Sequence, residues 1–175
     1  MVNLSDVIDP AYLEGLEGWA LQEVRTRRSQ ATEAETGLSY LRRIVQGRLD
    51  IVVAEQARRS SGRLGDVAEL VDELPTILAE NVHAPGLGRL PTLMVPGELD
   101  PELDRRLEEI LPSRLLVSLA DLTAEDLDHT ARELTEFERS ISAQRRAVLD
   151  VLDRLQEEVV RRYQTGEATV DSLLP

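Results

Sequence analysis

Two long stretches of the chain carry an uninterrupted helical pattern, and they constrain the fold more than any other feature. From about Ala20 to Ser60 no proline occurs, and apolar residues recur at helical spacing. A second stretch starts at Thr123, which forms an acidic variant of the capping box with Asp126, and it continues to about Thr165. Their similar lengths favour an all-α fold in which the two helices pack as an antiparallel coiled-coil hairpin.

The remaining segments are arranged around these two helices. Asp9 and Pro10 resemble an N-cap followed by proline at the first helical position, so a short helix is expected to follow them. Proline and glycine are frequent between the long helices, where we expect a short helix over 67–78 and a helical turn over 103–111. We therefore expect a short N-terminal helix, a first coiled-coil helix, a connecting segment, a second coiled-coil helix and a tail, over residues 1–19, 20–60, 61–122, 123–165 and 166–175.

Composition narrows the classes of function. The net charge of the 175 residues is −13, which makes DNA a poor partner because binding to duplexes relies on Lys and Arg to neutralise phosphates. Such a charge is better suited to a basic protein partner. The chain has no cysteine, so disulfides and thiolate metal sites are excluded. Neither a signal peptide nor an apolar run of about 18 residues is present, and we expect a cytoplasmic protein with no membrane partner.

The first long helix carries a polar stripe beside its apolar seam. The seam consists of Leu38, Leu41, Val45, Leu49 and Val52. The stripe, at steps of four, three, four and four, consists of Glu35, Ser39, Arg42, Gln46 and Asp50. At about 100° per residue, the stripe is centred about 100° away from the seam. It should therefore lie on the shoulder of the helix, between the core and the solvent-facing back.

The second long helix repeats this pattern at an offset of 103 residues, which takes Glu35 to Glu138. Seven of the sixteen residues in 138–153 are identical to their counterparts in 35–50. The stripe recurs as Glu138, Ser142, Arg145 and Asp153, and the seam as Ile141, Val148, Leu152 and Leu155. The mismatch in the stripe is Leu149, which stands where Gln46 stands in the first copy.

An antiparallel arrangement of the two helices would bring both stripes onto one face. A two-fold axis relates the helices of such a pair and carries one shoulder stripe to the same side as the other. Arginine offers a planar fork for phosphate or for O6 and N7 of guanine, and carboxylates accept hydrogen bonds from the N1 and N2 edge of guanine. The repeat thus favours a two-fold symmetric ligand that contains guanine and phosphate. The alternative is a solvated face with intrahelical salt bridges.

The motif Glu-x3-Ser-x2-Arg-x3-Gln-x3-Asp, complete in 35–50 and degenerate in 138–153, resembles the signature of the RsiG family of actinobacterial anti-sigma factors. The resemblance implies an antiparallel coiled coil that binds an intercalated dimer of cyclic di-GMP, one repeat serving each of the two molecules. It implies that the loaded protein holds a flagellar-type, WhiG-like sigma factor away from RNA polymerase and so represses sporulation genes.

The same resemblance implies which residues would contact the nucleotide. By position they are Glu35, Ser39, Arg42, Gln46 and Asp50 of the first copy and Glu138, Ser142, Arg145 and Asp153 of the second. Leu149 offers no hydrogen bond from its side chain, which implies fewer contacts for the second copy.

Other polar residues carry no comparable pattern. The two histidines, His83 and His129, are isolated, so no metal site is expected. No constellation for acid–base or nucleophilic catalysis occurs, and we do not expect an enzyme. Glu157 and Glu158 are expected to lie on a solvated face. The competing hypothesis for the whole chain is a structural coiled-coil adaptor without a nucleotide ligand.

Overall fold

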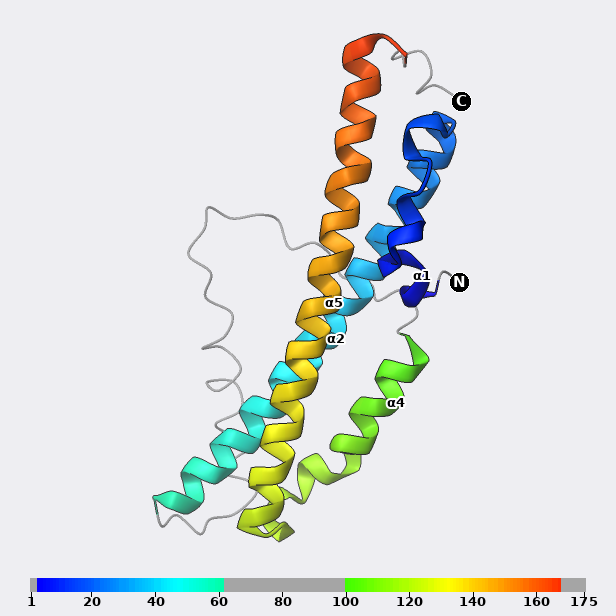
Figure 1. Ribbon diagram of the computed structural model, residues 1–175. Coiled ribbons are helices and arrows are strands. Elements are labelled where there is room, and N and C mark those ends of the chain that lie inside the picture. Colours follow the sequence, from blue (N-terminus) through cyan, green and yellow to red (C-terminus); the bar gives the residue numbers. More distant parts are fainter. Residues whose placement is uncertain (1–2, 62–99, 168–175) are drawn as a thin grey trace. The chain divides into compact units, whose positions relative to one another are not determined.

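The computed structural model describes residues 3–61 and 100–167, and within these ranges all regular secondary structure is helical (Figure 1). In chain order the elements are α1 (Leu4–Ile8), η1 (Pro10–Leu13), η2 (Leu16–Gly18), α2 (Leu21–Ser60), α4 (Pro101–Ile110), η4 (Ser113–Val117), η5 (Leu119–Asp121) and α5 (Ala124–Thr165). The expected all-α fold with two long helices is confirmed. The helix expected over 67–78 lies outside the described residues.

The helix ends follow the signals in the sequence. The capping box at the start of α5 is formed: the Asp126 amide donates to Oγ1 of Thr123 over 3.1 Å, and the Thr123 amide donates to Asp126 over 3.2 Å. At the other end of α5, Gly166 has φ +77°, the left-handed conformation that terminates many helices. The helical turn expected over 103–111 is confirmed as α4.

The N-terminal segment differs from the expected single helix. Asp9 does cap a helix with Pro10 at its first position, but that element, η1, is a short 3₁₀-helix. An additional helix, α1, precedes it and is capped by the side chain of Asn3, which accepts from the Ser5 amide over 3.2 Å. The physical reason is the spacing of caps, because Asn3 and Asp9 each offer an oxygen to orphan backbone amides and so start separate helices.

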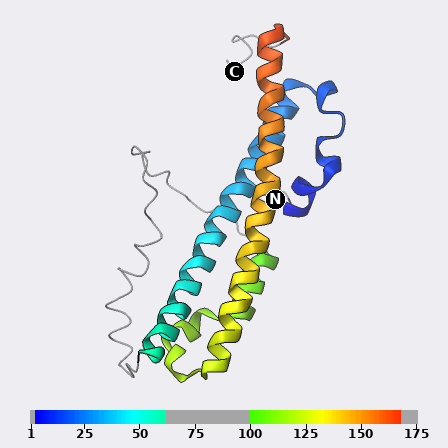
Figure 2. The same ribbon diagram turned by 60° about the vertical axis from the view of Figure 1, so that its left-hand side comes forward.

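Tertiary contacts divide the described residues into two compact units. Each unit contains part of α2 and part of α5, which lie alongside each other in both ribbon views (Figures 1 and 2). We call them unit 1 and unit 2, and they comprise residues 3–39, 100 and 142–167, and residues 40–61 and 101–141, respectively.

The two long helices run in opposite directions within each unit. In unit 1, Arg25 near the start of α2 donates to Tyr163 near the end of α5 over 2.6 Å. Further along α2, residue 35 contacts residue 145, so numbers rise in one helix as they fall in the other. Unit 2 shows the same order, with Gln56 bonded to Asp128 and residue 42 bonded to residue 138. The antiparallel pairing is therefore confirmed in both units.

A buried apolar residue recurs at every seventh position of each long helix. In α2 this series is Val24, Ala31, Leu38, Val45 and Val52, and in α5 it is Leu127, Leu134, Ile141, Val148 and Leu155; Leu41 and Phe137 are buried as well. Leu49 and Leu152, which were expected in the seam, are only partly buried. In α2 the buried edge of the seam is instead the edge that carries Arg48 and Glu55, whose exposed fractions are 8% and 1%.

The internal repeat extends well beyond the sixteen residues recognised in the sequence. The series α1, η1, η2 and α2 is followed by α4, η4, η5 and α5, with the same kinds of helix in the same order. The offset of 103 takes the start of η2, Leu16, to the start of η5, Leu119, and the start of α2, Leu21, to the start of α5, Ala124. The described residues thus contain two copies of one structural module.

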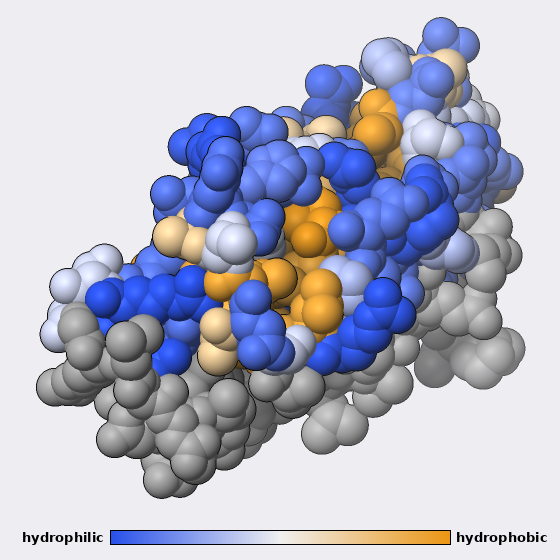
Figure 3. Space-filling model, turned by 90° about the horizontal axis from the view of Figure 1, so that it is seen from below, coloured by the Kyte–Doolittle hydropathy of each residue, from blue (hydrophilic) through white to orange (hydrophobic). Residues whose placement is uncertain are grey.

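Hydrophilic side chains cover much of the face drawn in Figure 3, with hydrophobic groups visible between them. The large hydrophobic residues that are exposed in the described ranges are Val53 and Val160, at 48% and 41%. Within the same ranges, no helix combines the length and the apolar content needed to cross a bilayer.

Candidate ligand site formed by the polar stripes

In unit 2, residues of both motif copies meet between the long helices. Arg42 of α2 donates from Nε to Oε1 of Glu138 of α5 over 2.8 Å. Gln46 donates from Nε2 to the same carboxylate oxygen over 3.3 Å. The side chains of Arg42 and Glu138 are 37% and 19% exposed, as a shoulder position requires. We call Arg42, Gln46 and Glu138 the unit 2 cluster.

In unit 1, a second set of motif residues meets in the same way. Arg145 of α5 donates from Nε to Oε1 of Glu35 over 2.8 Å and lies 2.7 Å from Oγ of Ser39. Ser39 in turn donates to Oε1 of Glu35 over 2.6 Å. The side chains of Arg145 and Glu35 are 35% and 19% exposed. We call Glu35, Ser39 and Arg145 the unit 1 cluster.

The two clusters correspond residue by residue. The offset of 103 takes Arg42 to Arg145 and Glu35 to Glu138, so the arginine of each motif copy is paired with the glutamate of the other copy. Both ion pairs join the two long helices, unlike the intrahelical pairs of an ordinary solvated face. The expectation that the two stripes meet is therefore confirmed within each unit.

Three further motif residues belong to neither cluster. Asp50 and Ser142 are partly buried on α2 and α5. Asp153 is exposed on α5. Leu149, the residue that departs from the motif, is partly buried, so the unit 1 cluster has no counterpart of the Gln46 amide at this position.

The expectation that Glu158 lies on a solvated face is wrong. Glu157 is 75% exposed as expected, but Glu158 is only 6% exposed and accepts hydrogen bonds from Arg161 over 2.8 Å and from Arg162 over 2.6 Å. These hydrogen bonds, first of all that from Arg161, hold the pKa of Glu158 down to about 2. The sequence does not predict the burial of Glu158, because two adjacent glutamates near a helix end resemble a charged surface.

Arg162 explains why this charge is buried. Its guanidinium donates to the backbone carbonyls of Trp19 over 2.7 Å and Leu16 over 3.1 Å, which belong to the turn that precedes α2. Glu158 and Arg162 thus form a clamp that fastens the end of α5 to the start of α2 in unit 1. A charge buried with a partner and with satisfied hydrogen bonds is compatible with a stable core.

Unit 2 contains the same clamp at the corresponding positions. Glu55 is 1% exposed and accepts from Arg59 over 2.7 Å, and hydrogen bonds from Arg58 and Arg59 lower its pKa. Arg59 donates to the carbonyls of Leu122 over 2.8 Å and Leu119 over 2.9 Å, before α5. The sequence pattern that corresponds to the clamp is Glu-x2-Arg-Arg, which occurs at 55–59 and again 103 residues later.

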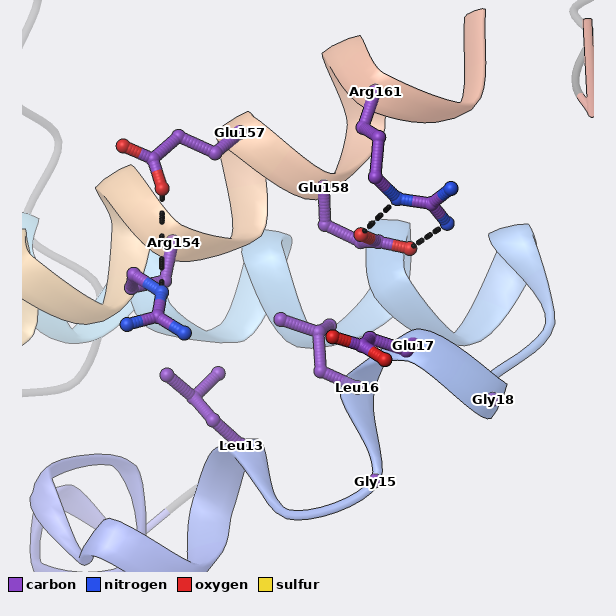
Figure 4. A pocket seen from close by; sticks show the side chains of 9 residues that line it. All are labelled: Leu13, Gly15, Leu16, Glu17, Gly18, Arg154, Glu157, Glu158 and Arg161. Carbon is purple, nitrogen blue, oxygen red and sulfur yellow. Dashed lines mark hydrogen bonds and ion pairs between the residues drawn. The ribbon is translucent and has the colours of Figure 1, made fainter. Parts of the chain in front are cut away.

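A cleft of about 690 Å³ lies elsewhere in unit 1, between the turn before α2 and the last part of α5 (Figure 4). Figure 4 shows Arg161 paired with Glu158, and Arg154 with Glu157, on its α5 side. The residues that line it are Leu13, Gly15, Leu16, Glu17, Gly18, Arg154, Glu157, Glu158 and Arg161. None of them belongs to the motif, so the cleft is distinct from the polar clusters. Across the described ranges, no three His, Asp or Glu residues are grouped as a metal site.

Comparison with known families agrees with the motif. Residues 10–78 match the model of a family described as RsiG-like. This region includes all of α2 and therefore the complete copy of the motif. No curated protein matches the chain. Over residues 10–78 the chain is thus similar to the RsiG-like family, in the region that carries the complete motif.

Proposed function

We propose that the protein is an anti-sigma factor that binds cyclic di-GMP on its paired polar stripes and, in that state, sequesters a flagellar-type, WhiG-like sigma factor from RNA polymerase. The match to the RsiG-like family supports the anti-sigma role. The proposal of a nucleotide ligand is supported by the reciprocal pairing of motif residues, in which Arg42 binds Glu138 and Arg145 binds Glu35.

A guanine base has the chemistry to replace such an ion pair. Its O6 and N7 accept hydrogen bonds from a guanidinium, and its N1 and N2 groups donate to a carboxylate. A base that enters between Arg42 and Glu138 would therefore leave neither charge without a partner. The same guanidinium can instead bind phosphate with its planar fork. Both groups are partly exposed, so the exchange takes place at the edge of the core.

Two copies of the pair suit a ligand with two guanines and two phosphates. Each unit presents one guanidinium and one carboxylate at the same separation, 2.8 Å from Nε to Oε1. Cyclic di-GMP carries its own two-fold symmetry, and we assign one molecule to each copy of the motif. The ligand-contacting residues are the nine motif residues named from the sequence.

The acidic character of the chain supports a basic protein partner. The net charge of −13 would attract the positively charged, polymerase- and DNA-facing surfaces of a sigma factor. A nucleotide on the shoulder of the helix pair can contact the hairpin and a bound partner together. Such a ligand would act as part of the interface, so the affinity for the sigma factor would depend on its presence.

The test is calorimetric titration of the full chain with cyclic di-GMP, together with capture of the sigma factor with and without the nucleotide. We expect binding in wild type and its loss in the Arg42→Ala/Arg145→Ala double variant. The matched control is Arg132→Ala, which removes an exposed arginine of α5 that donates to the backbone carbonyl of Asp128.

Three results would contradict the proposal. Absence of binding heat in wild type would favour a structural adaptor without a nucleotide ligand. Equal binding by the double variant would show that the clusters are not the site. Capture of the sigma factor that is unaffected by cyclic di-GMP would exclude the ligand-dependent mechanism.

A further inference from the structure

One glutamine in the seam of α5 has an unsatisfied polar atom. Gln144 lies three residues after Ile141 and four before Val148, both fully buried, so it shares their face of the helix. Its Oε1 is buried and has no hydrogen-bond partner. Buried side-chain acceptors are almost always satisfied in native proteins, so an exception calls for a specific explanation.

The internal repeat shows that the seam itself does not require this glutamine. The counterpart of Gln144 in α2 is Leu41, an apolar residue that is 1% exposed. The counterpart of Gln46, which belongs to the unit 2 cluster, is Leu149. Glutamine and leucine have therefore changed places between the seam and the stripe: α2 has Leu41 and Gln46, whereas α5 has Gln144 and Leu149.

The unit 1 cluster involves the residue that follows this glutamine in α5. Arg145 forms the ion pair with Glu35, about 100° around the helix from Gln144, and the cluster has no amide from position 149. A base that replaces the Arg145–Glu35 pair would enter between the two helices beside Gln144. The buried Oε1 would then face the N–H groups of that base and gain the hydrogen bond that it lacks in the free protein.

We propose that Gln144 is a ligand-binding residue of the second motif copy, where its side-chain oxygen accepts a hydrogen bond from an N–H group of a purine base and takes over the role of the missing motif glutamine. This inference rests on the proposed function, because it places the residue in the same nucleotide site. It extends that function by assigning a residue outside the motif. It also accounts for a polar group that the seam would be more stable without.

The test compares the stability and the nucleotide affinity of four full-length proteins. Gln144→Leu should raise the melting temperature, since it restores the apolar seam of α2, yet weaken one of the two cyclic di-GMP binding events by about tenfold, the effect of one hydrogen bond. Adding Leu149→Gln to this variant should restore the affinity, because it returns an amide to the motif position. Gln156→Leu, an exposed glutamine on the same helix, is the matched control and should change neither quantity.

A second variant guards against a change in packing from the branched leucine. Gln144→Met keeps an unbranched side chain of similar length without the amide, and it should weaken binding to the same extent. Higher stability with unchanged affinity in both variants would overturn the inference and leave Gln144 as a polar seam residue that fixes helix register. If wild type itself does not bind cyclic di-GMP, the proposed function has failed, and this inference fails with it.

Discussion

Arg42 and Glu138 are joined across two helices by an ion pair of 2.8 Å, although their positions are 96 residues apart in the chain. Both side chains remain partly exposed, at 37% and 19%. An ion pair with this much solvent contact contributes little net stability, because water screens the attraction and both side chains lose freedom. The pair is therefore suited to exchange its partners, in contrast to the buried clamp formed by Glu158 and Arg162.

The first prediction concerns the stability of the exposed pair. Arg42→Ala should lower the free energy of unfolding by less than about 1 kcal/mol, as measured by urea denaturation, because partly exposed ion pairs are worth little. The helix content measured by circular dichroism should stay at the wild-type value. A loss of several kcal/mol or of helicity would mean that the motif arginine is a structural residue.

The second prediction concerns the clamps. Arg162→Ala should lower the free energy of unfolding by about 3 kcal/mol, because it leaves the buried Glu158 with one cation fewer and two backbone carbonyls without their donor. Arg59→Ala should have an effect of similar size in the equivalent clamp of unit 2. Urea denaturation of both variants beside Arg42→Ala provides the comparison, and equal losses in all three would contradict the distinction between clamp and motif pair.

The third prediction concerns the stability of the folded protein at acidic pH. Folding lowers the pKa of Glu158 to about 2, so its carboxylate stabilises the folded state above the unfolded pKa of about 4.3. That contribution should be lost progressively as the pH falls from about 4.3 towards 2. Glu158→Gln should therefore make the melting temperature less sensitive to pH across this window. Glu157→Gln, at an exposed neighbour, should keep the pH profile of wild type, and identical profiles for all three proteins would contradict the assignment.

The fourth prediction concerns the start of α5. Thr123→Ala removes the hydroxyl that accepts from the Asp126 amide, and it should lower the free energy of unfolding by about 1 kcal/mol. Thr123→Ser keeps the hydroxyl and should retain most of the stability. Thermal denaturation of the two variants checks this, and an equal loss in both would show that the methyl group, rather than the cap, is the important feature.

The parts of the fold that depend on local pattern could be predicted from the sequence. The bounds of α2 and α5, the capping box at Thr123 and the helix end at Gly166 all follow from neighbouring residues. The meeting of the two polar stripes could be predicted as well, because an antiparallel pair of helices with shoulder stripes leaves few alternatives. The pairing of Arg42 with Glu138 is the result.

The parts that depend on distant contacts could not be predicted in the same way. Glu158 is buried because Arg162 reaches carbonyls about 145 positions earlier in the chain, and no local pattern shows that contact. The unsatisfied oxygen of Gln144 is likewise visible only once the seam is assembled. The repeat contained a usable signal nonetheless, since extending the comparison of the two helices would have exposed both copies of Glu-x2-Arg-Arg.

The paired clamps restrict how the two long helices can move. A slip of one helix by a heptad would carry Arg162 about 10 Å from the carbonyls it binds, and the same holds for Arg59 in the other unit. Axial sliding is thus opposed wherever a clamp is closed. On the proposed function, a nucleotide would therefore enter the stripe of either unit by side-chain rearrangement and without a change of helix register.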